Sequence, residues 1–364
     1  MKIGLISDSL NGLLTGVSYY TYNLVNNFDQ GTKNNLYLIN HHNNATFPHI
    51  KSIVIKNPFP FMKTYAWYPY IIRKINEHDL DIVHNPSQVP TYFPLKAKYV
   101  ITVNDLTPFI TPQESKTGRS SVFRMLFPKT LRSADKIICI SHNTKDDLIK
   151  KFNISSEKIS VIHLAVNDNF RKMDSLNAQK ILHNYGIRTP YILYVGTLEA
   201  RKNIPSLIKA FNKLKDLRIP HQLVIGGKMG WKYKEIFDLT NQLNLTNKIT
   251  FTGYVKEEDL PILYNAADLF VYPSLYEGFG LPPLEAMACG CPVITSNTSS
   301  LPEVVGDAGI MINPTDVNKL ADSIYEVLMD KGLQADLTRK GLDRAKLFSW
   351  KKCAEETQKI YRML

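Results

Sequence analysis

The chain has 364 residues, of which 44% are hydrophobic and 21% charged, and a formal net charge of +11. This length indicates two domains, each large enough to bury its own core, with the composition of an ordinary globular protein. No apolar run is long enough to span a bilayer, and the first residues resemble a buried strand rather than a signal peptide. We therefore expect a cytoplasmic protein, and its four cysteines fit a reducing compartment.

The positive charge is concentrated in the first half of the chain. Residues 1–165 contain 19 Lys and Arg against 11 Asp and Glu, whereas residues 166–364 contain 25 against 22. This excess indicates an anionic partner for the first half, such as a membrane surface, a lipid phosphate or nucleic acid. Dispersed, solvated lysines explain it equally well.

Short apolar strands alternate with longer helical patterns, which is typical of a doubly wound α/β fold. In the first half, strands are predicted at 3–7, 36–40, 53–55, 82–84, 99–103, 136–141 and 159–163. In the second half they are predicted at 191–195, 222–225, 249–252, 269–271, 293–295 and 309–312. The polar segment 166–190 between the two sets is interpreted as an inter-domain connector.

A glycine-rich loop follows the first predicted strand. It runs from Asn11 to Ser18, includes Gly16, and precedes a helix predicted at 19–25. Such a loop can present backbone amides to a phosphate or let an acceptor molecule approach. Because the loop lacks the pattern G-x-G-x-x-G, we do not expect a dinucleotide site.

Two stretches, 59–74 and 119–129, mix aromatic with basic residues. Either could lie at a membrane interface, with aromatic rings among the headgroups and cations on anionic lipid. The alternative is a helix with one face in the domain core. We weigh the two interpretations equally for the first stretch and favour the core helix for the second.

Three further patterns are better explained by structure than by chemistry. Asp79-Leu80-Asp81 is a D-x-D metal-binding pattern, but it directly precedes a predicted strand, so we predict a helix-to-strand turn and no required metal. His84 and His163 end strands without a partner at metal-ligand spacing, and each is predicted to be a packed or loop histidine. Gly226-Gly227-Lys228 lacks P-loop spacing and is predicted to form a turn beside the ligand site.

Arg201 and Lys202 are adjacent cations between a strand and a helix. They follow the strand at 191–195 and its turn at Gly196, and they precede an amphipathic pattern at 204–214. Such cations suit a diphosphate, because arginine can bind phosphate bidentately and lysine supplies a point charge. Taken alone, they would be interpreted as exposed surface cations.

The most informative segment is Glu277-Gly278-Phe279-Gly280-Leu281-Pro282-Pro283, followed by Glu285. It connects a predicted buried strand to a helix, whose free N–H groups and dipole favour an anion. Gly278 and Gly280 would let phosphates approach the backbone. We expect Glu277, in the loop, and Glu285, one turn into the helix, to contact different parts of one ligand. A helix-capping glutamate would explain one carboxylate, but neither the second nor the exposed loop between them.

The spacing of these two glutamates resembles the signature of retaining GT-B glycosyltransferases of family 4 (glycosyl transferases group 1). The similarity extends through Ser296–Val304 and Gly196–Asn203, and it is close over the second half of the chain and loose over the first. The resemblance implies two Rossmann-like doubly wound α/β domains facing a central cleft. Residues 1–165 would bind the acceptor and 166–348 the nucleotide sugar, while the last helix, 349–364, would pack back on the first domain.

The resemblance also implies individual roles at the donor site. Arg201 and Lys202 would neutralise the leaving nucleoside diphosphate. Glu277 would bind hydroxyls of the donor sugar, and Glu285 would bind the ribose diol.

The backbone amides of Phe279, Gly280 and Leu281 would meet sugar and phosphate. The loop Gly253-Tyr254-Val255 would flank the base, although a plain strand ending in a glycine turn explains it nearly as well. The other residues assigned to this site are Gly16, Gly196 and Gly278.

Asn104 follows the strand predicted at 99–103, where family members often carry a histidine beside the reacting face of the sugar. Asparagine can hydrogen-bond a hydroxyl but cannot titrate near neutrality. This agrees with a retaining mechanism in which the departing phosphate oxygen takes the acceptor's proton. We assign Asn104 to the catalytic residues with Glu277, Arg201 and Lys202, and we expect neither a metal nor a cofactor.

We therefore predict a retaining, metal-independent glycosyltransferase. It would move a hexose from a nucleotide diphosphate sugar to a hydroxyl of a glycan or lipid-linked acceptor, in surface polysaccharide or lipopolysaccharide synthesis. GDP-mannose is favoured over a UDP-hexose, with peripheral contact to the anionic inner face of the membrane and no nucleic acid partner. The alternatives are a GT-B phosphorylase, a sugar-nucleotide epimerase, or a non-catalytic module that binds anionic surfaces or nucleic acid.

Overall fold

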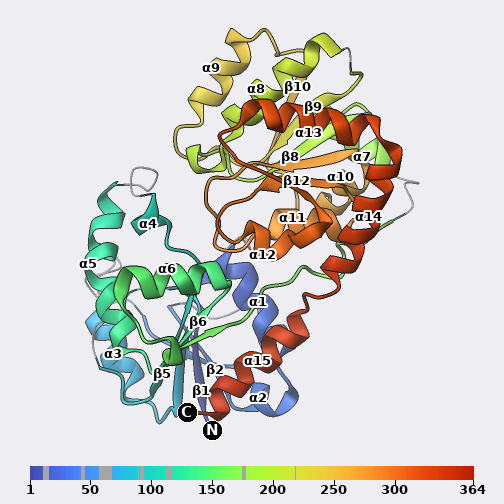
Figure 1. Cartoon of the computed structure of the whole chain (residues 1–364). Coiled ribbons are helices and arrows are strands. Elements are labelled where there is room, and N and C mark those ends of the chain that lie inside the picture. Colours follow the sequence, from blue (N-terminus) through green and yellow to red (C-terminus); the bar gives the residue numbers. More distant parts are fainter. Residues whose placement is uncertain are drawn as a thin grey trace. The chain divides into compact units, whose positions relative to one another are not determined.

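The computed structural model describes residues 1–10, 16–41, 46–56, 68–88, 90, 94–111, 117–173, 178–217 and 219–364. The chain divides into two compact units (Figure 1). The first unit comprises Met1–Leu164 and Ser349–Leu364, and the second comprises Ala165–Phe348. The division falls one residue before the boundary predicted from the sequence.

A parallel sheet forms the centre of the first unit. Its described strands are arranged in the order β3-β2-β1-β4-β5-β6-β7. They are β1 (Ile3–Ile6), β2 (Leu36–Asn40), β3 (Lys51–Val54), β4 (Ile82–Asn85), β5 (Lys98–Val103), β6 (Lys136–Cys139) and β7 (Ile159–Val161). The central strands are buried on both faces, which explains why their sequences are continuously apolar rather than alternating.

Helices cover this sheet. They are α1 (Val17–Asn27), α2 (Gln30–Asn34), α3 (Tyr68–Ile75), α4 (Thr107–Ile110), α5 (Thr117–Ser133), α6 (His142–Phe152) and α15 (Trp350–Arg362), with the 3-10 turns η1 (Asp8–Leu10) and η3 (Ser156–Lys158). The helices after β1 and β5 begin at the carboxyl ends of their strands, as in other doubly wound folds.

The second unit repeats this architecture. Among its described residues the sheet order is β10-β9-β8-β11-β12-β13, again parallel. The strands are β8 (Tyr191–Val195), β9 (Gln222–Gly226), β10 (Ile249–Gly253), β11 (Leu269–Tyr272), β12 (Val293–Ser296) and β13 (Ile310–Ile312). Every strand predicted from the sequence is present, with ends shifted by at most two residues.

The helices of the second unit are α7 (Ala178–Asn184), α8 (Ile204–Leu214), α9 (Lys234–Gln242), α10 (Leu260–Ala266), α11 (Leu281–Ala288), α12 (Leu301–Val305), α13 (Val317–Met329) and α14 (Lys331–Ala345). Short 3-10 turns are η4 (Ala200–Lys202), η5 (Lys215–Leu217) and η6 (Gly306–Ala308).

The interpretation of segment 166–190 as a connector is wrong. It contains α7 and belongs to the second unit. The hydroxyl of Tyr185 donates to Asp259 at 2.7 Å, and the N–H of Met173 donates to Asn265 at 2.8 Å. The segment looks polar because one side of α7 is exposed, while Leu182 on the other side is buried.

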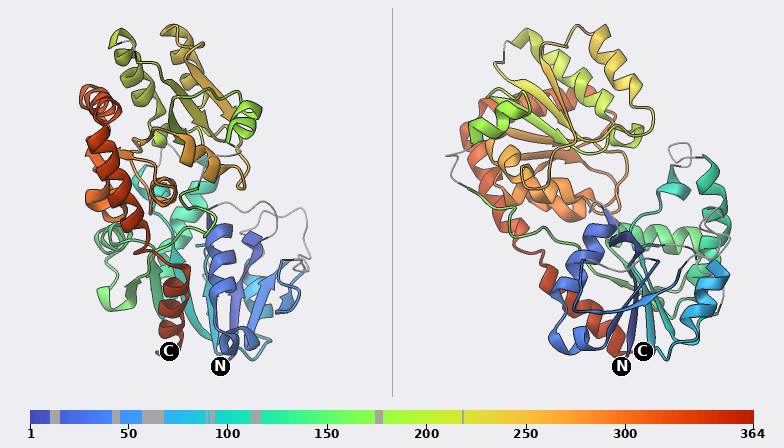
Figure 2. Two further views of the ribbon diagram at one scale, coloured as in Figure 1. Left: turned by 90° about the vertical axis from the view of Figure 1, so that its right-hand side faces the viewer. Right: turned by 180° about the vertical axis from the view of Figure 1, so that it is seen from behind.

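Helix α15, at the end of the chain, lies beside α1 in the first unit (Figure 2). A buried polar chain anchors it: Nδ1 of His84 lies 2.6 Å from the hydroxyl of Tyr361, and Nε2 lies 2.8 Å from Oγ1 of Thr102. The Tyr20 hydroxyl also bonds to Thr102. Burial lowers the pKa of His84 to about 3. The prediction of a packed histidine is confirmed for His84.

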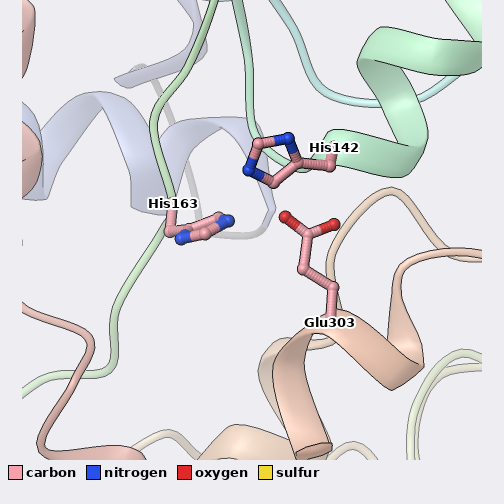
Figure 3. Close-up of side chains that lie close together, drawn as sticks. All are labelled: His142, His163 and Glu303. Atoms are coloured by element: carbon pink, nitrogen blue, oxygen red, sulfur yellow. The ribbon is translucent and has the colours of Figure 1, made fainter.

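For His163 the prediction was incomplete, because it has a histidine neighbour. The rings of His163 and His142 are 5.9 Å apart between centroids and arranged edge to face (Figure 3). Glu303, the third residue labelled in Figure 3, belongs to α12 of the second unit. Two imidazoles do not complete a metal site, which ordinarily has three or four protein ligands, so no metal is assigned to the pair.

The D-x-D pattern forms the predicted turn between α3 and β4. Asp79 accepts from Nζ of Lys2 at 2.8 Å, and Asp81 accepts from the N–H of Lys2 at 2.6 Å. Both carboxylates therefore hold the start of β1.

Of the two aromatic and basic stretches, the second forms α5. Its Leu126, Phe127 and Leu131 are buried, while Met125 is exposed, so one face of the helix packs in the core. In the first stretch, residues 59–67 lie outside the described part of the chain, and Ile71, Ile72 and Ile75 of α3 are buried. No described helix has both the length and the apolar character needed to cross a bilayer.

Candidate functional site

The candidate site lies where the strand order of the second sheet reverses. This reversal falls between β8 and β11, whose carboxyl ends lie side by side. In open parallel sheets, ligands bind outside the carboxyl ends at such a switch point. The loop beyond β8 carries Arg201 and Lys202, and the loop beyond β11 carries Glu277.

The structure brings these three side chains together. Nζ of Lys202 lies 2.6 Å from Oε1 of Glu277, and Nη1 of Arg201 lies 3.1 Å from Oε2. Arg201 also pairs with Glu199 at 2.7 Å and donates to the carbonyl of Tyr276. The alternative of two exposed surface cations does not hold, because Lys202 is only 8% exposed.

Two neighbouring hydroxyl groups complete the set of hydrogen-bond donors around the carboxylate of Glu277. Its Oε1 accepts from the Tyr272 hydroxyl at 3.0 Å and from the Ser274 hydroxyl at 2.6 Å, in addition to Lys202. The sequence analysis missed Tyr272 and Ser274. Their only signal was their position between β11 and the glutamate, which strand-forming propensity also explains.

The electrostatic balance keeps Glu277 ionised. Burial alone would raise its pKa, but the charges of Lys202 and Arg201, with hydrogen bonds from Lys202 and Ser274, outweigh this and lower the pKa to about 2. Burial lowers the pKa of Lys202, and the charge of Glu277 opposes that shift. A carboxylate and two cations are thus held together in a largely dry environment, where charge interactions are strong.

The glycine turn after Glu277 is buried rather than exposed, contrary to expectation. Gly280 has φ +129°, and a Cβ there would lie 2.9 Å from Leu301. Ser300 donates to the carbonyl oxygens of Glu277 and Phe279, at 2.9 and 2.5 Å. Helix α11 begins at Leu281, so its first N–H groups point out of the helix at this turn.

A second serine, Ser299, accepts the N–H of Glu277 at 3.0 Å. Ser299 and Ser300 belong to the segment 296–304 that carries part of the family resemblance, but the sequence alone assigned them no role.

Glu285 lies in α11 and faces α10. Its Oε2 accepts from the hydroxyl of Tyr264 at 2.9 Å. Burial raises the pKa of Glu285 to about 7, partly opposed by the Tyr264 hydrogen bond. Glu285 and Glu277 therefore have different environments, one near the middle of its titration at neutral pH and the other fully ionised.

Three glycine turns meet beside this site. The N–H of Gly196 donates to the carbonyl oxygen of Gly226 at 2.9 Å, and the N–H of Gly227 donates to the carbonyl oxygen of Gly253 at 2.7 Å. A Cβ on Gly227 would lie 1.9 Å from the carbonyl oxygen of Gly196. Of the predicted turn at Gly226-Gly227-Lys228, Gly226 ends β9 and the chain bends at Gly227.

The loop expected to flank a base presents one exposed ring. Tyr254 is 45% exposed, and Nζ of Lys228 lies 4.5 Å from its ring centroid. Val255 is buried, so its side chain is not available to a ligand.

Two predicted residues belong to the first unit. Gly16 precedes α1 with φ +47°, and residues 11–15 of its loop lie outside the described part of the chain. Asn104 follows β5; its N–H donates to Oε1 of Gln88 at 2.7 Å, and Nδ2 donates to the carbonyl of Pro86 at 3.1 Å. Gln88, which the sequence analysis missed, thus holds the main chain at Asn104, while the carbonyl of Pro86 holds the side-chain amide.

Family models match both halves of the chain. A family model described as glycosyl transferases group 1 matches residues 179–344, and one described as glycosyltransferase family 4 matches residues 14–170. The chain is 36% identical to O-antigen chain mannosyltransferase B of Escherichia coli over 78% of this chain and 74% of that protein. It is 32% identical to O-antigen chain mannosyltransferase RfbU of Salmonella typhimurium over 64% of this chain and 62% of that protein.

Among solved structures, HepE of Anabaena in complex with UDP and glucose is similar in fold. The TM-score is 0.79 at 19% identity, and the match covers all of both chains. At this identity the likeness shows the two-domain fold alone.

Proposed function

This chain belongs to the family 4 glycosyltransferases of group 1, and on that basis we propose that it transfers mannose from GDP-mannose to a hydroxyl of a glycan or lipid-linked acceptor. The product would be a surface polysaccharide or lipopolysaccharide chain. The mannosyltransferase relatives support the sugar, and GDP is the nucleotide that ordinarily carries activated mannose. The phosphorylase, epimerase and non-catalytic alternatives are not favoured by these relatives.

The cluster of Arg201, Lys202 and Glu277 is the observation that carries the proposal. Arg201 and Lys202 supply two positive charges where a diphosphate would leave. Such preorganised charges stabilise the transition state, because they act where negative charge develops and need not reorganise. Glu277, ionised at neutral pH, would accept hydrogen bonds from hydroxyls of the donor sugar.

We propose that the transfer retains the anomeric configuration. The bond from the anomeric carbon to the phosphate oxygen breaks, and a bond from that carbon to the acceptor oxygen forms on the same face. The acceptor's proton moves to the departing phosphate oxygen, so no titrating side chain is needed at Asn104. The two cations would take the charge-neutralising role that a metal ion has in other phosphate chemistry.

The remaining donor residues follow from the same site. The amides of Phe279, Gly280 and Leu281, at the start of α11, would meet sugar and phosphate. Glu285 would bind the ribose diol, and the exposed ring of Tyr254 would flank the base. Gly196, Gly253 and Gly278 would allow close approach to the backbone.

We further propose that the basic first unit contacts the anionic inner face of a membrane, where a lipid-linked acceptor would lie. The support is the +8 excess in residues 1–165 and the exposed Met125 on α5. Binding to anionic vesicles, lost at high salt and absent with neutral vesicles, tests this contact.

Thermal unfolding with GDP, UDP, GDP-mannose and UDP-glucose, each with and without a chelator, tests the donor. A ligand that binds only the folded protein raises the melting temperature. We expect a chelator-insensitive rise with GDP and GDP-mannose, followed by transfer of labelled mannose to a mannoside. A rise with UDP alone would overturn the choice of donor, and no rise with any of them would overturn the donor site itself.

A further inference from the structure

A hydrogen-bonded aspartate and histidine lie at the carboxyl edge of the first sheet, apart from the donor residues described above. Asp8 follows β1 in η1, and His41 directly follows β2. The N–H of His41 donates to Oδ1 of Asp8 at 2.8 Å, and Nε2 of the ring lies 3.0 Å from Oδ2. Nδ1 of the same ring lies 3.3 Å from the carbonyl oxygen of Ile55, which follows β3. The pair thus joins the ends of three neighbouring strands.

Asp8, one member of this pair, lies beside the switch point of the first sheet, where parallel sheets bind ligands. The order of the first sheet reverses between β1 and β4, so the loop after β1 belongs to its switch point. In the second sheet the equivalent strands are β8 and β11, whose loops carry Arg201, Lys202 and Glu277. Asp8 after β1 therefore corresponds in position to Arg201 and Lys202 after β8, whereas His41 follows β2, one strand away from the switch point.

The chemistry of Asp8 suits hydroxyl groups. Each carboxylate oxygen receives one bond from His41 and keeps a second lone pair that can accept another. The side chain is 30% exposed, so solvent or a ligand reaches it. Two adjacent oxygens match a pair of neighbouring hydroxyls on a sugar ring.

His41 holds the carboxylate of Asp8 in place. Its ring lies between two strand ends, with Nε2 facing Oδ2 of Asp8 and Nδ1 facing the carbonyl oxygen of Ile55. Among the described residues, no third His, Cys, Asp or Glu makes a metal-ligand set with Asp8 and His41. A neutral polyol therefore fits this place better than a cation.

We infer that Asp8 binds two neighbouring hydroxyls of the acceptor sugar, and that His41 is the positioning residue that holds its carboxylate. The inference rests on the proposed transferase function and adds to it the residue that recognises the acceptor.

Asp135 provides a matched control on the opposite edge of the same sheet. It accepts the N–H of Tyr99 at 2.8 Å and pairs with Nζ of Lys98 at 3.1 Å, and it is 33% exposed. Asp8 and Asp135 thus each bridge to a neighbouring strand with similar exposure, but Asp135 precedes β6 at the amino edge, where ligands are not expected.

The experiment compares the full-length wild type, Asp8→Asn and Asp135→Asn. Methyl α-mannoside is the acceptor probe, with its binding measured by ligand-detected NMR without donor and its KM measured with GDP-mannose. In Asp8→Asn we expect the dissociation constant and the KM for the mannoside to rise about tenfold or more, because a charge-assisted hydrogen bond is lost. The KM for GDP-mannose and the thermal shift with GDP should stay within about twofold, and Asp135→Asn should match the wild type.

His41→Gln keeps the main-chain N–H and should raise the mannoside KM by a smaller factor with kcat unchanged. Equal mannoside binding and KM in wild type and Asp8→Asn would overturn the inference and leave the transferase intact. Mannoside binding that depends on Asp8 without turnover of GDP-mannose would support the inference and refute the proposed donor.

Discussion

Lys202 and Glu277 form a buried ion pair that joins two loops 75 residues apart in the chain, with 2.6 Å between Nζ and Oε1. Neither charge could be held there alone, because an unpaired buried charge is costly. The pair therefore fixes the loop beyond β8 against the loop beyond β11 and preorganises both for a ligand.

Glu277→Gln should reduce transfer about a hundredfold or more, because the amide replaces an anionic acceptor of sugar hydroxyls. The variant should still bind GDP, because it keeps Arg201 and Lys202, the cations assigned to the diphosphate. Steady-state transfer and GDP titration measure the two effects. Transfer within about twofold of the wild type would remove Glu277 from the catalytic residues.

The double variant Arg201→Gln with Lys202→Gln should lose affinity for GDP, which Glu277→Gln keeps. Losing two charge-assisted contacts should weaken GDP binding about a hundredfold, measured by calorimetry. The matched control is Arg339→Gln with Lys340→Gln, because these adjacent cations of α14 also share one carboxylate, Asp336, at 2.6 and 2.8 Å. Equal GDP affinity in both double variants would contradict the site.

The raised pKa of Glu285 predicts how the free energy of unfolding depends on pH. Burial raises its folded-state pKa to about 7, above the ordinary value of 4.5, so the folded protein holds a proton that the unfolded chain releases. Its contribution is fully present below pH 4.5 and is lost as the pH rises through 7. The unfolding free energy of the wild type should therefore fall between pH 5 and 8, by at most about 3 kcal/mol.

Denaturant titrations across this pH range measure that effect, and Glu285→Gln is the control. The fall should be flattened in this variant, because the amide does not titrate. An equal slope in both proteins would show that another group is responsible.

Tyr361→Phe should destabilise the first unit by about 1–3 kcal/mol, because it leaves Nδ1 of buried His84 without its partner. Tyr325→Phe, at an exposed tyrosine of α13, should lower the free energy of unfolding by far less. Chemical denaturation with tryptophan fluorescence provides the measurement, since Trp350 of α15 lies 5.9 Å from Tyr19 between ring centroids. Equal losses in the two variants would argue against a role for the buried polar chain in anchoring α15.

Much of the fold and of the candidate site could be predicted from local sequence patterns. The strands were readable because those buried on both faces are continuously apolar, and the position of Glu277 was readable because a glycine turn followed a strand and opened a helix. Arg201 and Lys202 are adjacent in the sequence, so the sequence alone places them close together.

Only the tertiary structure decided how these parts meet. The pairing of Lys202 with Glu277, the serines that hold the glycine turn, and the contact of Gln88 with Asn104 all join residues far apart in the chain. Segment 166–190 looked like a connector because its composition is polar, yet packing against α10 makes it part of the second unit. Periodicity and turn chemistry depend on near neighbours, whereas burial and the pairing of charges depend on which distant strands become adjacent in the sheet.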